Sequence, residues 1–197
     1  MVLKKKKEKK VSEPISKKQG ADQEVSSSLE TLIAALSSKD DGARVRARHS
    51  LVAIGKAAVP SLAEALKNTD DLVRWEAAKT LGEIEVPEAA PFLVKALEDE
   101  AFDVRWLAAV GLIGMNIKGL KPLLHALMEH GDSVLIREGA HHVVHDLTKG
   151  ELRKYLAPVL AALENVEPGL SVPQAAFHAL EMLERGKMIS DTWMHTS

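Results

Sequence analysis

Four segments of the chain repeat one pattern at a nearly constant interval, and this repetition constrains the fold more than any other feature. They align without gaps as ARVRARHSLVAI, VRWEAAKTLGEI, VRWLAAVGLIGM and IREGAHHVVHDL. The second position is always arginine, at intervals of 30, 31 and 32 residues: Arg44, Arg74, Arg105 and Arg137. A period of this length is typical of repeat architectures, in which each repeat is one small supersecondary unit.

Each segment has the apolar spacing of a helix. Alanine stands three residues after each arginine, leucine or valine seven after, and a larger apolar residue ten after. Offsets 3, 7 and 10 fall on one stripe of a helix with 3.6 residues per turn. A second helical unit lies between the segments and opens on Pro60, Pro91, Pro122 or Pro158. Proline is tolerated in a first helical turn, where its missing N–H has no partner anyway.

Each repeat is therefore predicted to be a helix, a short turn and a second helix. Neither helix buries its apolar stripe alone, but stacked pairs bury a continuous core. The Pro-x-Leu of the first helix, the Asp of the turn and the Arg-x-x-Ala-x-x-x-Leu of the second resemble HEAT-like repeats of the phycobilisome-lyase type, within the armadillo-like helical proteins. The resemblance implies an all-α, right-handed α-solenoid of about five antiparallel helix pairs. It says little of function, because such repeats serve scaffolds, chromophore lyases and a di-iron hydroxylase alike.

The repeats divide the chain into three parts. Residues 1–27 are Lys-, Ser- and Glu-rich and are expected to form a disordered N-terminal tail, because they bury too little apolar surface. The last repeat is expected to be a degenerate cap, because it has no arginine and Pro173 stands in its place. The predicted parts are the tail 1–27, the solenoid 28–186 with repeats at about 28–57, 58–87, 88–119 and 120–150 and a cap at 151–186, and a C-terminal tail 187–197.

Composition limits the compartment and the partners. The chain has no cysteine and no run of about 18 apolar residues, which favours a cytoplasmic protein without a membrane span. Residues 1–20 carry eight Lys and two Glu, so against a net charge of −2 the remainder carries −8. An acidic solenoid disfavours a nucleic-acid groove, although the Lys-rich tail can contact nucleic acid weakly by charge. The favoured interpretation of that tail is a solubilising segment.

The arginine column invites two interpretations. One is an anion-binding stripe. The favoured one is structural, with each arginine bonded to a turn aspartate of its own or a neighbouring repeat in a ladder of charge-assisted bonds. The same aspartates are expected to cap the second helices. The predicted ladder consists of the four arginines above and Asp41, Asp71, Asp103 and Asp132.

The second helices are expected to line the concave face, the usual binding surface of such arrays. Offsets 1, 2, 5 and 9 from each arginine lie opposite the buried stripe and should point outward. Trp75 and Trp106 share offset 1, so they are expected to lie side by side as binding anchors; the alternative is that both rings pack between repeats. The other predicted binding residues are Leu107 and Val110 beside them, Lys79, Glu76 and Glu83 as a charged rim, and His49 and His142 at offset 5.

Catalysis is the weaker hypothesis. His141, His142 and His145 have helical spacings that suit a metal ion, but a third ligand must come from elsewhere and no other repeat supplies a matching pair of histidines. The favoured interpretation is one buried and two surface histidines. The di-iron hydroxylase that the chain resembles in fold uses His-Glu dipeptides, and this chain has none. The sequence therefore predicts a non-enzymatic module without cofactor that binds a protein or peptide; the alternative is a metal-dependent enzyme or chromophore-lyase accessory.

Overall fold

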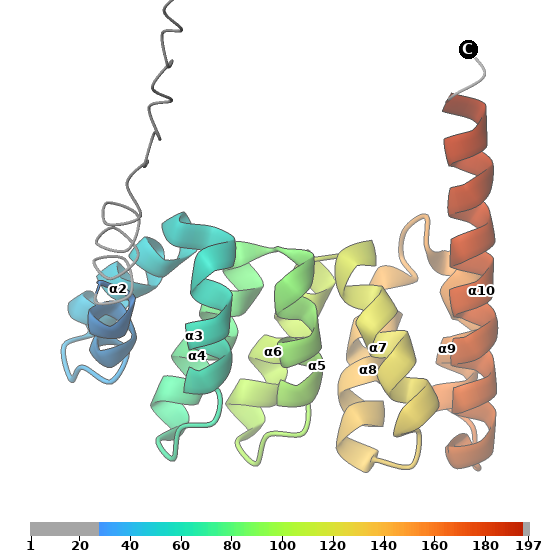
Figure 1. Ribbon diagram of the computed structural model, residues 1–197. Helices are drawn as coiled ribbons and strands as arrows, with labels where there is room; N and C mark the ends of the chain where they lie inside the picture. The colour runs from blue at the N-terminus through green and yellow to red at the C-terminus, as the bar shows by residue number, and fades with distance from the viewer. Residues whose placement is uncertain (1–27, 195–197) are drawn as a thin grey trace, which may run out of the picture.

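The computed structural model describes the backbone of residues 28–194 and the side chains up to residue 186. Throughout this part the chain is helix and turn, without a strand (Figure 1). The predictions for residues 1–27 lie outside it. The elements are a helix at residues 28–35, α2 (Asp41–Ile54), η1 (Gly55–Ala58), α3 (Val59–Ala65), α4 (Asp71–Ile84), η2 (Pro87–Ala89), α5 (Ala90–Ala96), α6 (Phe102–Gly114), α7 (Ile117–Glu129), α8 (Val134–Leu147), α9 (Arg153–Leu163) and α10 (Pro168–Met194).

The helices form two layers of a helical solenoid, as the repeat pattern predicts. The first helices α3, α5 and α7 lie in one layer, and the second helices α4, α6 and α8 lie behind them in Figure 1. Along the second layer α4 packs between α2 and α6, and α6 packs against α8. The all-α solenoid predicted from the sequence is thus confirmed.

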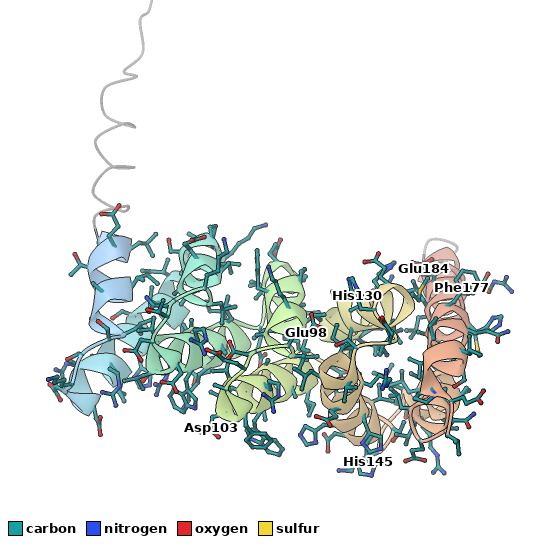
Figure 2. All side chains as sticks on the ribbon, turned by 90° about the horizontal axis from the view of Figure 1, so that it is seen from below. Glu98, Asp103, His130, His145, Phe177 and Glu184 are labelled. Atoms are coloured by element: carbon teal, nitrogen blue, oxygen red, sulfur yellow. The ribbon has the colours of Figure 1, made fainter. Side chains whose placement is uncertain are left out.

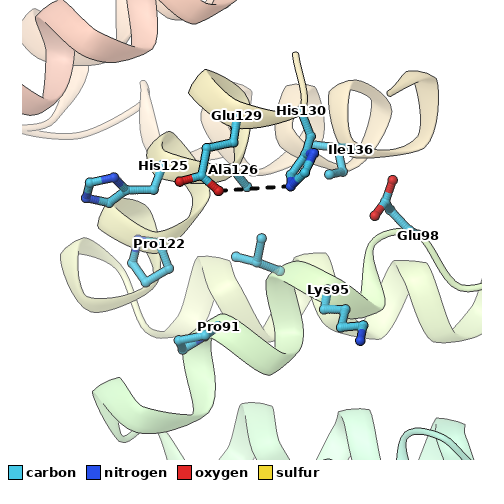
Figure 3. A pocket seen from close by; sticks show the side chains of 10 residues that line it. Pro91, Lys95, Glu98, Pro122, His125, Ala126, Glu129, His130 and Ile136 are labelled. Atoms are coloured by element: carbon cyan, nitrogen blue, oxygen red, sulfur yellow. Dashed lines mark ion pairs between the residues drawn. The ribbon is translucent and has the colours of Figure 1, made fainter. Parts of the chain in front are cut away.

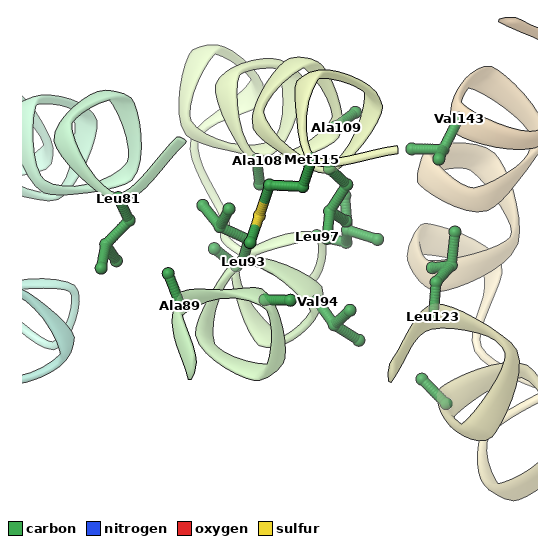
Figure 4. Packing of buried hydrophobic residues seen from close by; sticks show 14 of the residues in the cluster. Leu81, Ala89, Leu93, Val94, Leu97, Ala108, Ala109, Met115, Leu123 and Val143 are labelled. Atoms are coloured by element: carbon green, nitrogen blue, oxygen red, sulfur yellow. The ribbon is translucent and has the colours of Figure 1, made fainter. Parts of the chain in front are cut away.

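The predicted apolar stripe lies in the core. The alanines at offset 3 and the leucines or valine at offset 7 are buried in all four repeats, and they belong to one cluster that runs through the array. Of the residues at offset 10, Met115 is buried, whereas Ile54, Ile84 and Leu147 are only partly buried. Figure 4 shows how Leu93 and Val94 of α5 and Ala108 of α6 continue this packing toward Leu123 and Val143.

Each arginine of the column makes the same hydrogen bond in its own repeat. The guanidinium Nη1 donates a hydrogen bond to the backbone carbonyl six residues earlier, in the turn that follows the first helix. These bonds run from Arg44 to Ser38 (2.6 Å), Arg74 to Asn68 (2.9 Å), Arg105 to Asp99 (2.8 Å) and Arg137 to Gly131 (2.9 Å). Carbonyls beyond a helix end have no intrahelical partner, and a cation there complements the helix dipole. We call this contact the arginine clamp.

The clamp replaces most of the predicted Arg–Asp ladder, which was wrong in its partners. Only Arg44 bonds the carboxylate of a predicted aspartate, that of Asp41. Arg74 instead bonds Asp99, at 2.8 Å and 3.1 Å, from the turn of the next repeat. In the described part of the chain Asp71, Asp103 and Asp132 form no ion pair within 4 Å, and Arg105 and Arg137 bond only carbonyls. The hydrogen bond with Asp99 raises the pKa of Arg74 against the opposing effect of burial, so this guanidinium stays charged.

The side-chain caps of α2, α4 and α8 lie one residue from the predicted aspartates, whereas α6 has no side-chain cap and Asp103 is its second residue. Asp40 accepts a hydrogen bond from the Gly42 N–H, and Asp70 accepts one from Leu72. Asp41 and Asp71 are thus the first residues of their helices, where a carboxylate still suits the positive helix end. A third cap also replaces the predicted residue, because Ser133 and not Asp132 caps α8.

The C-terminal pair joins the array with its layers exchanged. Pro158 aligns α9 with the first helices, yet α9 packs on α8, and α10 packs across α7. Lys121 of α7 lies 3.6 Å from Glu184 of α10. A side chain at Gly131 would meet the ring of Pro173 at 2.8 Å, so this glycine permits the approach. α10 continues through Met194, and most of the segment predicted as a C-terminal tail is therefore helical.

The second helices come closest together at two glycines. A Cβ built on Gly82 of α4 would lie 2.9 Å from the Cα of Gly111 on α6, and the reverse distance is the same. Backbone cannot yield as a flexible side chain can, so a methyl group here has to push the helices apart.

We predict that Gly82→Ala destabilises the protein by about 1–3 kcal/mol, because the added methyl overpacks the contact between α4 and α6. Thermal unfolding followed by circular dichroism measures it. Gly114→Ala is the matched control: its Cβ meets only the Glu85 carboxylate at 3.5 Å, so the melting temperature should hold or rise slightly. Equal melting temperatures for Gly82→Ala and the wild type would contradict the close contact.

We predict that Arg74→Ala lowers the free energy of unfolding by about 3 kcal/mol, because it removes the clamp and leaves the Asp99 side chain, only 10% exposed, without its cation. Urea unfolding measures the difference. Arg46→Ala removes an exposed pair with Asp40 at 3.5 Å and should cost less than about 1 kcal/mol. A loss of partner binding by Arg74→Ala at unchanged stability would instead support the anion-stripe interpretation.

Candidate functional site

An apolar stripe runs along the outer side of α6. Phe102, Trp106 and Val110 follow one another at intervals of four residues, which places them on one helix face. Their side chains are 65%, 48% and 43% exposed. Large apolar side chains that share one exposed face form a patch, and patches of this kind mark interaction sites more often than isolated residues do.

Trp106 connects this stripe to the next repeat. Its ring stacks on the His142 ring of α8, with centroids 4.5 Å apart and planes inclined by 29°. It also stacks on the Phe102 ring of its own helix, with centroids 6.5 Å apart. The indole thus contacts two rings while almost half of its surface faces solvent, and these contacts restrict its orientation.

Trp75 of α4 completes the set. It is half-buried, packs against the core, and carries Lys79 Nζ over its ring at 4.8 Å. Trp75 and Phe102 line one pocket between the first turns of α4 and α6. Phe102 thus links the two tryptophans that the sequence expected to lie side by side. We call Trp75, Phe102, Trp106, Val110 and His142 the aromatic patch.

Sequence reasoning missed Phe102, although a signal for it was present. Phe102 stands four residues before Trp106, so it shares that helix face, but it falls outside the four aligned segments. Leu107, expected beside the tryptophans, is partly buried and packs against the core. The exposed stripe on α6 therefore consists of Phe102, Trp106 and Val110, and the predicted Leu107 is not part of it.

The predicted rim contains one error. Glu83 is exposed and Lys79 partly so, but Glu76 is buried, with 2% of its surface exposed. Its Oε2 accepts a hydrogen bond from Arg48 at 2.7 Å and its Oε1 one from Arg44 at 3.2 Å. The prediction that offset 2 points outward is wrong at Glu76, because α2 of the preceding repeat packs over that side of α4. Glu76, Arg44 and Arg48 form what we call the ionic triad.

The three histidines do not share one site, although the rings of His141 and His145 stack with their centroids 6.0 Å apart. In the described residues no group of three His, Cys, Asp or Glu side chains is placed to hold a metal ion. His142 stacks on Trp106, while His141 Nε2 lies 3.3 Å from Glu164. None of the set is buried, which corrects the expectation of one buried histidine among His141, His142 and His145. The neighbouring Asp146 accepts a hydrogen bond from Lys149, which lowers the pKa of that carboxyl.

The two faces of the array differ. Figure 2 shows Asp103 and His145 on the side of the second helices, with His130 and Glu184 on the other side. There a groove of about 540 Å³ lies between α5 and α7, with Pro91 and Pro122 in its walls (Figure 3). His130 Nε2 and Glu129 Oε2 are 4.0 Å apart at its rim.

The two histidines predicted at offset 5 lie far apart in the array. His49 is exposed on α2, and α4 and α6 lie between α2 and α8, which carries His142.

Comparisons with known proteins concern the fold. The family profile described as HEAT repeats matches residues 29–113. No curated protein matches the chain. Among solved structures, the crystal structure of an engineered protein from the Northeast Structural Genomics Consortium aligns with 77% of both chains at 20% identity and a TM-score of 0.36. In the described part of the chain no helix is both long and apolar enough to cross a membrane.

We predict that Glu76→Gln destabilises the protein by about 3 kcal/mol, because Arg44 and Arg48 lose their shared anion. Differential scanning calorimetry measures the change. Glu138→Gln, an exposed residue of α8, should change stability by less than about 0.5 kcal/mol. An unchanged melting temperature in Glu76→Gln would contradict the stabilising role of the ionic triad.

Proposed function

We propose that this HEAT-like repeat protein is a non-enzymatic scaffold that binds a protein or peptide on the face formed by α2, α4, α6 and α8. HEAT repeats stack helix pairs into an extended surface, and solenoids use such surfaces to bind other proteins. The observation that carries the proposal is the exposed stripe of Phe102, Trp106 and Val110 on the outer face of α6.

The chemistry of the stripe suits a binding anchor. Tryptophan is enriched among the few interface residues that supply most of the binding energy, because its ring buries much apolar area with few torsions to fix. The stack with His142 restrains Trp106 before binding, which lowers the entropy cost of association. Trp75 is the second anchor, with Lys79 and Glu83 as the charged rim. Buried Glu76 has no part in it.

The alternative of a metal-dependent enzyme or chromophore-lyase accessory draws no support from the site. His142 stacks on Trp106, whereas the rings of His141 and His145 stack on each other and His141 Nε2 lies 3.3 Å from Glu164. The phycobilisome-lyase subtype and the cytoplasmic location stay predictions from the sequence.

We predict that Trp106→Ala weakens partner binding at least about tenfold, because a tryptophan anchor contributes roughly 2 kcal/mol or more. A photo-crosslinking amino acid at Val110 captures partners in cells, and mass spectrometry quantifies them with and without Trp106→Ala. Phe177→Ala is the matched control, since Phe177 is a similarly exposed aromatic residue on α10, away from the patch (Figure 2). Equal capture by wild type and Trp106→Ala, at equal stability, would contradict the proposal.

A further inference from the structure

A pocket of about 520 Å³ opens between the first turns of α4 and α6, beside the aromatic patch. The rings of Trp75 and Phe102 line it, together with the apolar side chains of Leu72 and Val104. Phe102 also stacks on Trp106, so the pocket continues directly into the patch. A segment bound along the patch therefore passes the mouth of the pocket.

Two carboxylates stand in the lining of this pocket. Asp71 is the first residue of α4 and Asp103 the second of α6, and both are exposed. Within the described residues neither is within ion-pair distance of a basic side chain. The only basic residue of the lining, Arg44, is already bonded to Asp41 and Glu76. The pocket thus combines aromatic walls with two exposed carboxylates that form no ion pair in the described residues, although Asp71 interacts electrostatically with Arg74 at longer range.

The two rings already contact cations of their own helices. Lys79 Nζ lies 4.8 Å from the ring centroid of Trp75, and Arg105 Cζ lies 5.6 Å from that of Phe102. Aromatic faces attract cations through their quadrupole. Neither Lys79 nor Arg105 lines the pocket, so their charges do not fill it.

We propose that this pocket receives a lysine or arginine side chain of the partner, flanked by apolar residues that cover the aromatic patch. The inference rests on the proposed function and names the chemistry of its ligand. The aliphatic stem would lie against Trp75 and Phe102, and the charged head would reach Asp71 and Asp103. The charge of −8 beyond residue 20 also attracts a basic segment at long range.

The test uses a minimal cation and its neutral isostere. Full-length protein is titrated with butylguanidinium and, separately, with butylurea, and the indole N–H signal of Trp75 is followed by NMR, assigned by its absence in Trp75→Phe. Butylguanidinium should saturate this signal with at least about fivefold higher affinity than butylurea at low salt. In the double variant Asp71→Asn with Asp103→Asn the two probes should become equal.

Controls separate the pocket from general electrostatics. Asp132→Asn removes an exposed turn carboxylate outside the pocket and should keep the full preference for the cation. Unchanged dispersion of the amide spectrum shows that each variant is folded. Equal affinity for the two probes in the wild type, or a preference that survives loss of both pocket carboxylates, overturns the inference.

The chain's own lysines are the competing occupant. In a full-length variant with glutamine at Lys4, Lys5, Lys6, Lys7, Lys9 and Lys10, the affinity for butylguanidinium should stay within about twofold of the wild type. A rise of tenfold or more would assign the pocket to the N-terminal lysines and overturn a partner side chain as its ligand. If crosslinking at Val110 depends on Trp106 while the cation preference is absent, only this inference fails and the proposed function stands.

Discussion

The arginine clamp is the contact on which the geometry of each repeat depends. In four repeats a guanidinium in the first turn of the second helix donates a hydrogen bond to the backbone carbonyl six residues before it, in the turn between the two helices. A turn held in this way fixes the angle between the two helices of a pair. Every apolar stripe then faces the same core, and the outer side of every second helix faces the same surface.

The sequence predicted the periodic part of this structure and missed what depends on neighbouring repeats. Ala77 and Leu81 are buried as expected because their spacing within one helix decides their burial. The bond from Arg74 to Asp99 and the burial of Glu76 depend instead on which residues the adjacent repeat brings near, and a helical wheel contains no such information. The exchanged layers of α9 and α10 escaped prediction for the same reason.

The candidate site follows the same division. Trp106 and Val110 were expected on the outer face, and they are exposed there. The contacts of Trp106 with His142 and Phe102 could not be predicted, because they depend on how α6 packs against α8 and on where α6 begins. The interfaces between second helices also differ in character. An ionic triad joins α2 to α4, whereas two glycines let α4 and α6 meet backbone to backbone.

The exchange of layers at α9 and α10 bears on whether such an array can grow. Successive helices reverse direction, so α10 runs opposite to α7 where a regular first helix would run parallel to it (Figure 1). Head-to-tail contacts that do not close on themselves lead to open filaments. The α9–α10 pair therefore presents the reverse helix polarity at this end of the described array, so a helix pair stacked on it would meet α10 where the preceding repeats present a first helix of the opposite direction.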